Sequence, residues 1–119
     1  MTQTEFDAEL ALGKRSWQGS HVEGDLDVSE REIHGDVCFS GMTVSGDLDL
    51  SGTVIHGSLE LVDARVSGNL NLDGLRVMGR FNTNQWSLAN IDGEVIANDL
   101  VVRGRLRTIT SHRAQTQEP

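Results

Sequence analysis

The sequence predicts an all-β fold, a right-handed parallel β-helix (β-solenoid) whose eleven-residue repeats pair into coils of about 22 residues. Three observations predict it. Glycine recurs every eleven residues, apolar residues recur at fixed distances from each glycine, and two residue types alternate with twice that period. Such a pattern is typical of chains that stack short equivalent units around one continuous core.

Glycine marks the repeat. Eleven residues separate the successive members of the series Gly24, Gly35, Gly46, Gly57, Gly68 and Gly79. The spacing resumes from Gly93 to Gly104 after a step of fourteen, which indicates a three-residue insertion within Asn84 to Ala89. Gly13 lies eleven residues before the series and begins a degenerate first repeat.

Apolar residues hold fixed positions when each glycine is counted as position one. Position three holds Leu26, Val37, Leu48, Leu59, Leu70, Phe81, Val95 and Leu106. The position two before each following glycine holds Ile33, Val44, Ile55, Val66, Val77, Ile91 and Val102. Positions five and eight are mostly apolar, although Arg15 breaks position three and Arg31 breaks position eight. This period of two indicates two very short strands per repeat, with turns at the glycines and at position seven.

Two repeats are expected in each coil, because eleven residues give too small a perimeter for a closed coil with a filled interior. His34 and His56 are 22 residues apart, as are Ser45 and Ser67, and the two types alternate. A strand of three or four residues buries little alone, so it must stack on the equivalent strand of the next coil. The sequence therefore predicts columns of residues separated by 22 positions.

The chain divides into three segments. Residues 1–12 are expected to form a capping helix, with Thr4 to Asp7 as a capping box and Phe6 and Leu10 on one face. The solenoid is predicted over residues 13–107. Residues 108–119 are polar and are expected to be a disordered tail.

Composition narrows the classes of function. The net charge is −8, which argues against direct nucleic-acid binding. No stretch approaches the roughly 18 apolar residues that span a membrane, and the single cysteine, Cys38, has no partner for an internal disulfide. A cytoplasmic location is expected. No catalytic, cofactor-binding or metal-binding motif is recognised.

An acidic patch is the first candidate binding surface. Stacking with a period of 22 places four aspartates at neighbouring outward positions: Asp25, Asp27, Asp47 and Asp49. Their mutual repulsion would be relieved by a cation or by basic groups of a protein partner. The alternative is that these carboxylates only keep the surface soluble.

Charge is also uneven along the chain, which suggests a second candidate surface. Val22 to Gly74 contains eleven acidic residues and two arginines, a net of −9, whereas Leu75 to Pro119 contains six arginines and four acidic residues, a net of +2. The basic cluster on the last coil comprises Arg103, Arg105 and Arg107. It either contacts the acidic region of another molecule or protects the last strands from uncontrolled pairing. Trp86, in the insertion, is either a local plug or a contact residue.

The histidines are expected to be exposed turn residues. His34 and His56 would stack beside one another, but the sequence offers no third metal ligand in register, since His21 is displaced by two residues. Cys38 faces outward, with no histidine spaced to activate it.

Two repeat families resemble this pattern. Gly35-Asp36-Val37 and the segments Val44 to Leu48 and Val66 to Leu70 are similar to the V-x-G-x-[IV] punctuation of bactofilins, the polymer-forming bacterial cytoskeletal β-helices. The pattern of two inward residues per side resembles pentapeptide-repeat proteins, some of which mimic DNA. The first resemblance implies self-association, and the second implies occupation of a basic groove.

The sequence thus favours a non-enzymatic structural or scaffold module that self-associates or docks onto another protein. The alternative is an acidic inhibitor that mimics nucleic acid and occupies the basic groove of a DNA- or RNA-binding partner. No cofactor is expected in either case.

Overall fold

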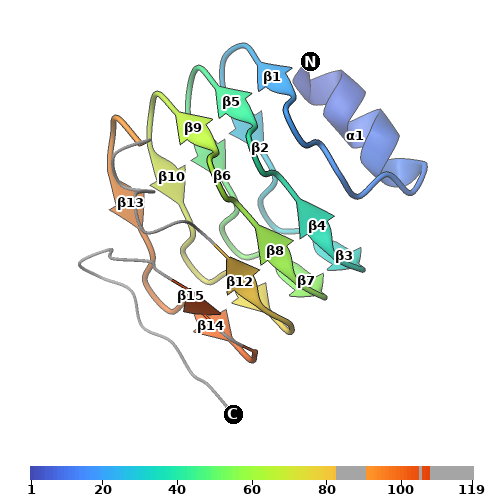
Figure 1. Cartoon of the computed structure of the whole chain (residues 1–119), viewed down its shortest axis with the longest axis vertical. Helices are drawn as coiled ribbons and strands as arrows, with labels where there is room; N and C mark the ends of the chain where they lie inside the picture. The colour runs from blue at the N-terminus through green and yellow to red at the C-terminus, as the bar shows by residue number, and fades with distance from the viewer. Residues whose placement is uncertain (83–90, 105, 108–119) are drawn as a thin grey trace.

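The computed structural model is a parallel β-solenoid of about three turns with one short helix at its N-terminal end (Figure 1). It describes residues 1–82, 91–104 and 106–107. The predicted fold class is therefore confirmed. The insertion with Trp86 and the tail 108–119 lie outside the described residues, so the expectations for both stay predictions.

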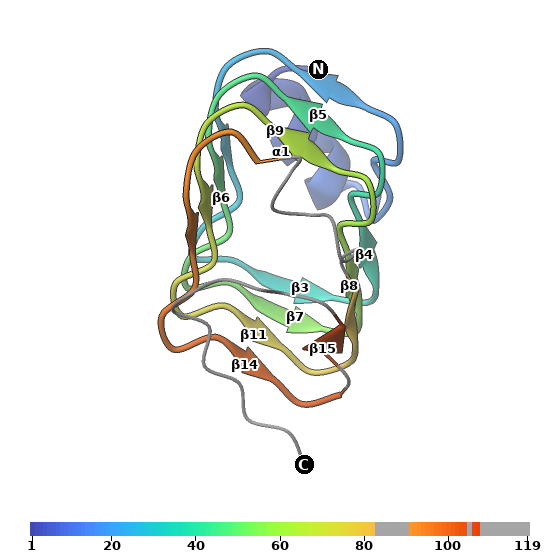
Figure 2. The ribbon, with the colours of Figure 1, turned by 60° about the vertical axis from the view of Figure 1, so that its left-hand side comes forward.

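Four parallel sheets form the four sides of the solenoid (Figure 2). The first contains β1 (His21–Val22), β5 (Thr43–Val44) and β9 (Arg65–Val66). The second contains β2 (Leu26–Asp27), β6 (Leu48–Asp49), β10 (Leu70–Asn71) and β13 (Val95–Ile96). The third contains β3 (Glu32–His34), β7 (Val54–His56), β11 (Arg76–Val77) and β14 (Val101–Val102). The fourth contains β4 (Val37–Cys38), β8 (Leu59–Glu60), β12 (Phe81–Asn82) and β15 (Leu106–Arg107).

The register of the coils follows the predicted period. Leu26 pairs with Leu48, which pairs with Leu70, so residues 22 positions apart are neighbours. After the insertion the offset becomes 25, because Leu70 pairs with Val95. Ile91 keeps its inward place and bridges to Val66. The extra residues are therefore accommodated without a change of face in the following strands.

The core consists of the predicted inward columns. Position three and the position two before each glycine are buried through most of the solenoid, as shown by Leu59 and Ile55, both 0% exposed, whereas Val95 in the last coil is half-buried. Most of the remaining core side chains are aliphatic, and Thr53 is the buried polar residue among the described positions. Its hydroxyl donates to the carbonyl of Val28 and accepts from the amide of Arg31, so it meets the requirement that buried polar groups be hydrogen-bonded.

Two kinds of corner turn the chain, for different physical reasons. At position seven the backbone is left-handed, as at Gly41 (φ 69°) and Asp63 (φ 60°), a conformation that glycine, aspartate and asparagine tolerate best. At position one the constraint is space. A Cβ on Gly57 would lie 2.5 Å from the carbonyl carbon and oxygen of Gly35 in the preceding coil. Glycine therefore recurs at position one because the backbones of successive coils lie too close together there for a side chain.

Helix α1 (Gln3–Ala11) closes the N-terminal end of the solenoid. The predicted capping box at Thr4 to Asp7 is wrong, because Thr2 is the N-cap. The Thr2 hydroxyl accepts the backbone N–H of Glu5, and the Glu5 carboxylate accepts the backbone N–H of Thr2. The true box has the same spacing but begins two residues earlier. Phe6 is buried against Trp17, with ring centroids 4.6 Å apart, so the helix covers the first coil with an aromatic contact.

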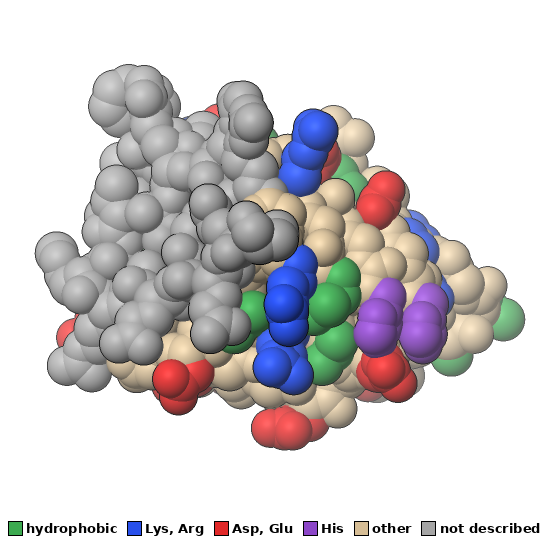
Figure 3. Space-filling model, turned by 90° about the horizontal axis from the view of Figure 1, so that it is seen from below, with side chains coloured by type: hydrophobic (Ala, Val, Ile, Leu, Met, Phe, Trp, Pro, Cys, Tyr) green, Lys and Arg blue, Asp and Glu red, His purple; other side chains and the backbone are tan. Residues whose placement is uncertain are grey.

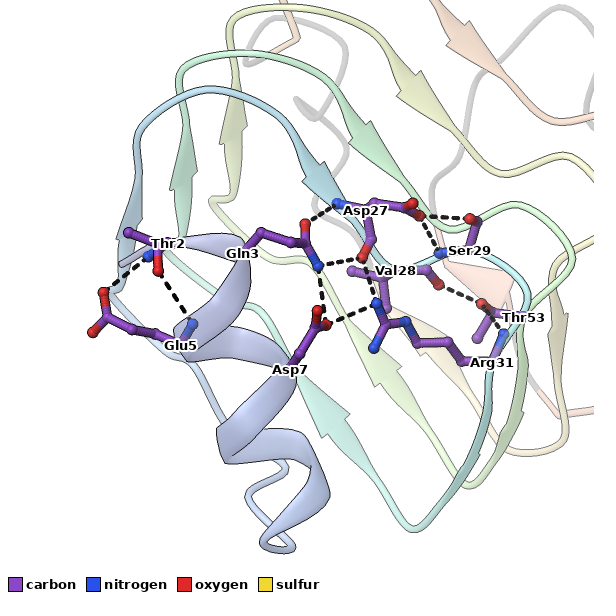
Figure 4. Close-up of polar contacts among 9 residues, drawn as sticks. All are labelled: Thr2, Gln3, Glu5, Asp7, Asp27, Val28, Ser29, Arg31 and Thr53. Carbon is purple, nitrogen blue, oxygen red and sulfur yellow. Dashed lines mark hydrogen bonds and ion pairs between the residues drawn. The ribbon is translucent and has the colours of Figure 1, made fainter.

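Side chains also occupy the exposed backbone edge of the first coil (Figure 4). The Gln3 amide donates to the carbonyl of Asp27 and accepts from its N–H at 2.9 and 2.7 Å, as an additional strand would. Arg31 donates to the same carbonyl and forms an ion pair with Asp7 at 2.8 Å. Arg15 donates to the carbonyl of His34. The two arginines that break the apolar pattern therefore help to cap the edge.

No helix among the described residues is both long enough and apolar enough to cross a membrane.

Replacing Leu59 by Asp should remove the cooperative unfolding transition. The change places an unpaired charge in a fully buried column and should cost about 4 kcal/mol or more. Circular dichroism melting measures the effect. The matched control is Leu12→Asp, because Leu12 is 88% exposed; equal melting of both variants would contradict the register.

Replacing Gly57 by Ala should cost about 3 kcal/mol, because the new methyl group meets backbone that is fixed in the ladder. Gly41→Ala should cost only about 1 kcal/mol, since its Cβ is in ordinary contact and only the left-handed conformation is disfavoured. Urea unfolding of the two variants measures the difference. Equal losses would show that the position-one glycines are needed for conformation and not for space.

Candidate functional site

The outward side chains of β3, β7, β11 and β14 form one continuous surface, which we call the histidine face (Figure 3). Outward residues flank each buried residue of these strands. One column contains Glu32, Val54, Arg76 and Val101. The next column begins with His34 and His56, and it continues with Met78 and Arg103, the residues that directly follow β11 and β14. Along the solenoid, the surface thus changes from acidic and imidazole groups at β3 and β7 to arginines at β11 and after β14, with apolar side chains from β7 onward.

Two stacked histidines and a glutamate form a cluster at the N-terminal end of this face. The His34 and His56 rings lie parallel, with centroids 4.5 Å apart and an angle of 6° between their planes. Nε2 of His56 lies 2.8 Å from a carboxylate oxygen of Glu32. All three residues are exposed. The predicted stacking is confirmed, and the cluster is held by strands of two successive coils.

The surroundings of Glu32 favour its ionised form. The hydrogen bond from His56, together with the positive charges that His56 and His34 acquire on protonation, lowers the pKa of Glu32 below its ordinary value. The carboxylate therefore stays charged, and available as an acceptor or metal ligand, to a lower pH than a free glutamate would.

The structure supplies the third potential metal ligand that the sequence analysis did not find. Glu32, His34 and His56 each offer one ligand atom, and these atoms all lie within 4.8 Å of one another. Glu32 precedes His34 by two residues, so the period of two in a strand places both side chains on the same face. This spacing is visible in the sequence, but Glu32 is a diagonal neighbour of His56, 24 residues away, and so falls outside the period of 22.

The middle and the far end of the histidine face have a different character. Val54 and Met78 are half-buried, which leaves apolar area at the surface. Arg76 and Arg103 are exposed. Figure 3 shows this order of histidine, hydrophobic and basic side chains across the visible surface.

The four predicted aspartates lie together but are engaged in the backbone. Asp27 pairs with Asp49 in the ladder, as predicted. Asp25 accepts the N–H of Asp47 at 2.8 Å, and Asp47 accepts the N–H of Asn69 at 2.7 Å. These bonds join position two of one coil to position two of the next.

The same contact recurs at the opposite corner, where Asp36 accepts the N–H of Ser58 and Ser58 accepts the N–H of Arg80. Asn69 continues the first series by accepting from Glu94. From Asp25 to Asn69, position two therefore holds a short side chain with an acceptor oxygen, whether charged or neutral.

Asp27 and Asp49 act within their own coils. Each accepts the N–H of the residue two positions later, Ser29 or Ser51, which is an Asx turn. Hydrogen bonds from the hydroxyl and the amide of Ser29 lower the pKa of Asp27. The acidic surface thus has a structural role that the sequence analysis missed, since one oxygen of each carboxylate is used to fix a turn or a corner.

The other predicted contact residues are only partly described. Arg103 is exposed at the end of the histidine face. Arg107 belongs to β15, whereas Arg105 and Trp86 lie outside the described residues. Cys38 is half-buried, and its sulfur lies 3.7 Å from the carboxylate of Glu60 in a shallow groove of the fourth sheet.

No protein-family model matches this chain, and no curated protein or solved structure is significantly similar to it. The class defined by the geometry is a four-sided parallel β-solenoid with a helical N-terminal cap.

Replacing Asp47 by Ala should lower the free energy of unfolding by about 1 kcal/mol, because the amide of Asn69 loses its acceptor. Asp47→Asn should be nearly neutral, since an amide oxygen fills the same place at Asn69. Urea unfolding measures both. A larger loss for the asparagine variant would mean that the charge, and not the acceptor, matters.

Proposed function

We propose that the protein is a non-enzymatic scaffold module that pairs with a second copy of itself through the histidine face. The observation that carries the proposal is the order of side chains on that face, from Glu32 on β3 to Arg76 on β11 and Arg103 after β14. A two-fold axis perpendicular to the solenoid would bring the acidic end of each copy against the basic end of the other. Such an interface is self-complementary, as symmetric dimers require.

The charge distribution of the whole chain favours the same antiparallel arrangement. Residues 22–74 carry a net charge of −9 and residues 75–119 a net charge of +2. Two parallel copies would place like charges side by side, whereas two antiparallel copies would place the arginines of one against the acidic coils of the other. Electrostatic complementarity of this kind fixes orientation and speeds association.

The centre of the face supplies apolar area for the contact. Val54, Met78 and Val101 are half-buried and lie between or beside the charged ends. An apolar centre with charged groups around it is the usual composition of a protein interface. Methionine adapts its shape to a partner more readily than branched side chains do.

Side-by-side pairing also agrees with the covered N-terminal end. Phe6 of helix α1 is buried over the first coil, and the side chains of Gln3 and Arg31 form hydrogen bonds with backbone groups at the edge of that coil. Stacking of coils end to end would require removal of this cap. The resemblance to bactofilins supports self-association, and the cap favours the sides of the solenoid over its ends.

The acidic-inhibitor alternative has less support. It relies on Asp25, Asp27, Asp47 and Asp49 as contact groups, and each already uses an oxygen for a backbone hydrogen bond. Within the described residues, Arg76 and Arg103 of the histidine face make no such internal hydrogen bond, so both are available to a partner.

Reversing both Arg76 and Arg103 to Glu should shift the protein from dimer to monomer in sedimentation equilibrium, by at least tenfold in dissociation constant. Arg65→Glu is the matched control, since Arg65 is exposed on β9 of another face. Adding Glu32→Arg to the double variant should restore pairing in part. A monomeric wild type at high concentration, or equal effects of the control, would refute the proposal.

A further inference from the structure

The fold does not require the chemistry of the Glu32, His34 and His56 cluster, and the proposed pairing uses only the charge of Glu32. The buried residue of β3 is Ile33, and the three exposed side chains of the cluster contribute nothing to the core. We propose that this cluster is a binding site for one divalent transition-metal ion of the Zn²⁺ type. This inference goes beyond the proposed function and does not depend on dimer formation.

The donor atoms favour that class of ion. Two imidazole nitrogens and one carboxylate oxygen form a ligand set that zinc uses in proteins, with a fourth position left for water or another ligand. Imidazole also suits Ni²⁺, Co²⁺ and Cu²⁺. Calcium and magnesium prefer sites made wholly of oxygen, so one carboxylate beside two imidazoles selects against them.

The backbone holds the ligands close together before any ion arrives. His34 and His56 are directly paired on β3 and β7, and the ladder on either side of them is closed by hydrogen bonds from Val54 to Arg31 and from Gly35 to His56. The three donor atoms already lie within 4.8 Å of one another. Small rotations of the side chains can bring them onto one ion.

Because the ligand side chains are exposed, those rotations cost little free energy. The side chain of His56 is 37% exposed and that of Glu32 is 64% exposed, so neither needs the core to move. The ion pair between Glu32 and His56 accounts for the position of one imidazole only. The second imidazole, stacked in register at 4.5 Å, is what completes a set of three ligands.

Binding should also stabilise the fold. The ligands belong to two successive coils, so one ion links β3 to β7 across the ladder. A ligand that binds the native state and not the unfolded chain raises the melting temperature. The stabilisation should vanish when the ion is removed by a chelator.

The test uses full-length protein at a concentration where sedimentation shows a monomer. The chain has four histidines, and the fourth, His112, lies outside the described residues. His112→Gln is therefore introduced into the reference protein and every variant. Zn²⁺ is titrated by calorimetry, Co²⁺ binding is followed by visible absorption, and imidazole ¹⁵N shifts are recorded during the Zn²⁺ titration.

The reference protein should bind one Zn²⁺ per chain, with shifts confined to His34 and His56 and a higher melting temperature that a chelator reverses. His34→Gln/His56→Gln and Glu32→Gln should each lose affinity by about tenfold or more, while their melting without metal is unchanged. His21→Gln is the matched control and should bind normally, since His21 lies on β1. The proposal is overturned if the reference protein binds no Zn²⁺, or if the cluster variants bind as tightly as His21→Gln.

Discussion

The close approach of successive coils at their glycine corners is the constraint on which the rest of this structure depends. A Cβ on Gly57 would collide with the backbone of Gly35, and a Cβ on Gly46 or Gly68 would collide with the aspartate oxygen of the coil before it. The absent side chain leaves the space in which the Asp25 or Asp47 carboxylate reaches the next amide. Glycine at position one and an acceptor at position two are thus parts of one contact.

That contact fixes the register, and the register fixes the surface. Once Leu26 lies on Leu48 and Leu48 on Leu70, each outward residue is stacked on the residue 22 positions along the chain, or 25 positions where the insertion intervenes. The His34–His56 stack follows from this alone, as do the basic groups further along the same face. A solenoid builds its functional surfaces as columns, so a substitution at one coil changes one element of a column and leaves the others in place.

The glycine spacing and the apolar columns were enough to predict the fold, because both arise from contacts that repeat in every coil. The non-repeating contacts were harder to predict. Arg15 and Arg31 break the apolar pattern, and only the structure reveals that they cap the edge beneath α1. The sequence does not distinguish the two possible helix starts, because Thr2 and Thr4 each precede an acidic residue by three positions and so carry the same capping signal.

The candidate site was half predictable. The histidine column follows from the period of 22, but the contact between Glu32 and His56 is diagonal and depends on side-chain length and rotamer. The charge of the aspartates predicts a patch but does not reveal their hydrogen bonds to the backbone. Ser58 and Asn69 occupy position two in other coils and accept the same kind of hydrogen bond, which indicates that position two requires an acceptor oxygen and not a charge.

Amide-to-amide nuclear Overhauser effects in deuterated, ¹⁵N-labelled protein test the register of the coils most directly. Parallel strands about 4.8 Å apart bring paired amides within range. The structure predicts cross-peaks between residues 22 apart, such as Val37 and Leu59, and between residues 25 apart after the insertion, such as Leu70 and Val95. Cross-peaks between residues eleven apart, or a set with no constant offset, would contradict the account.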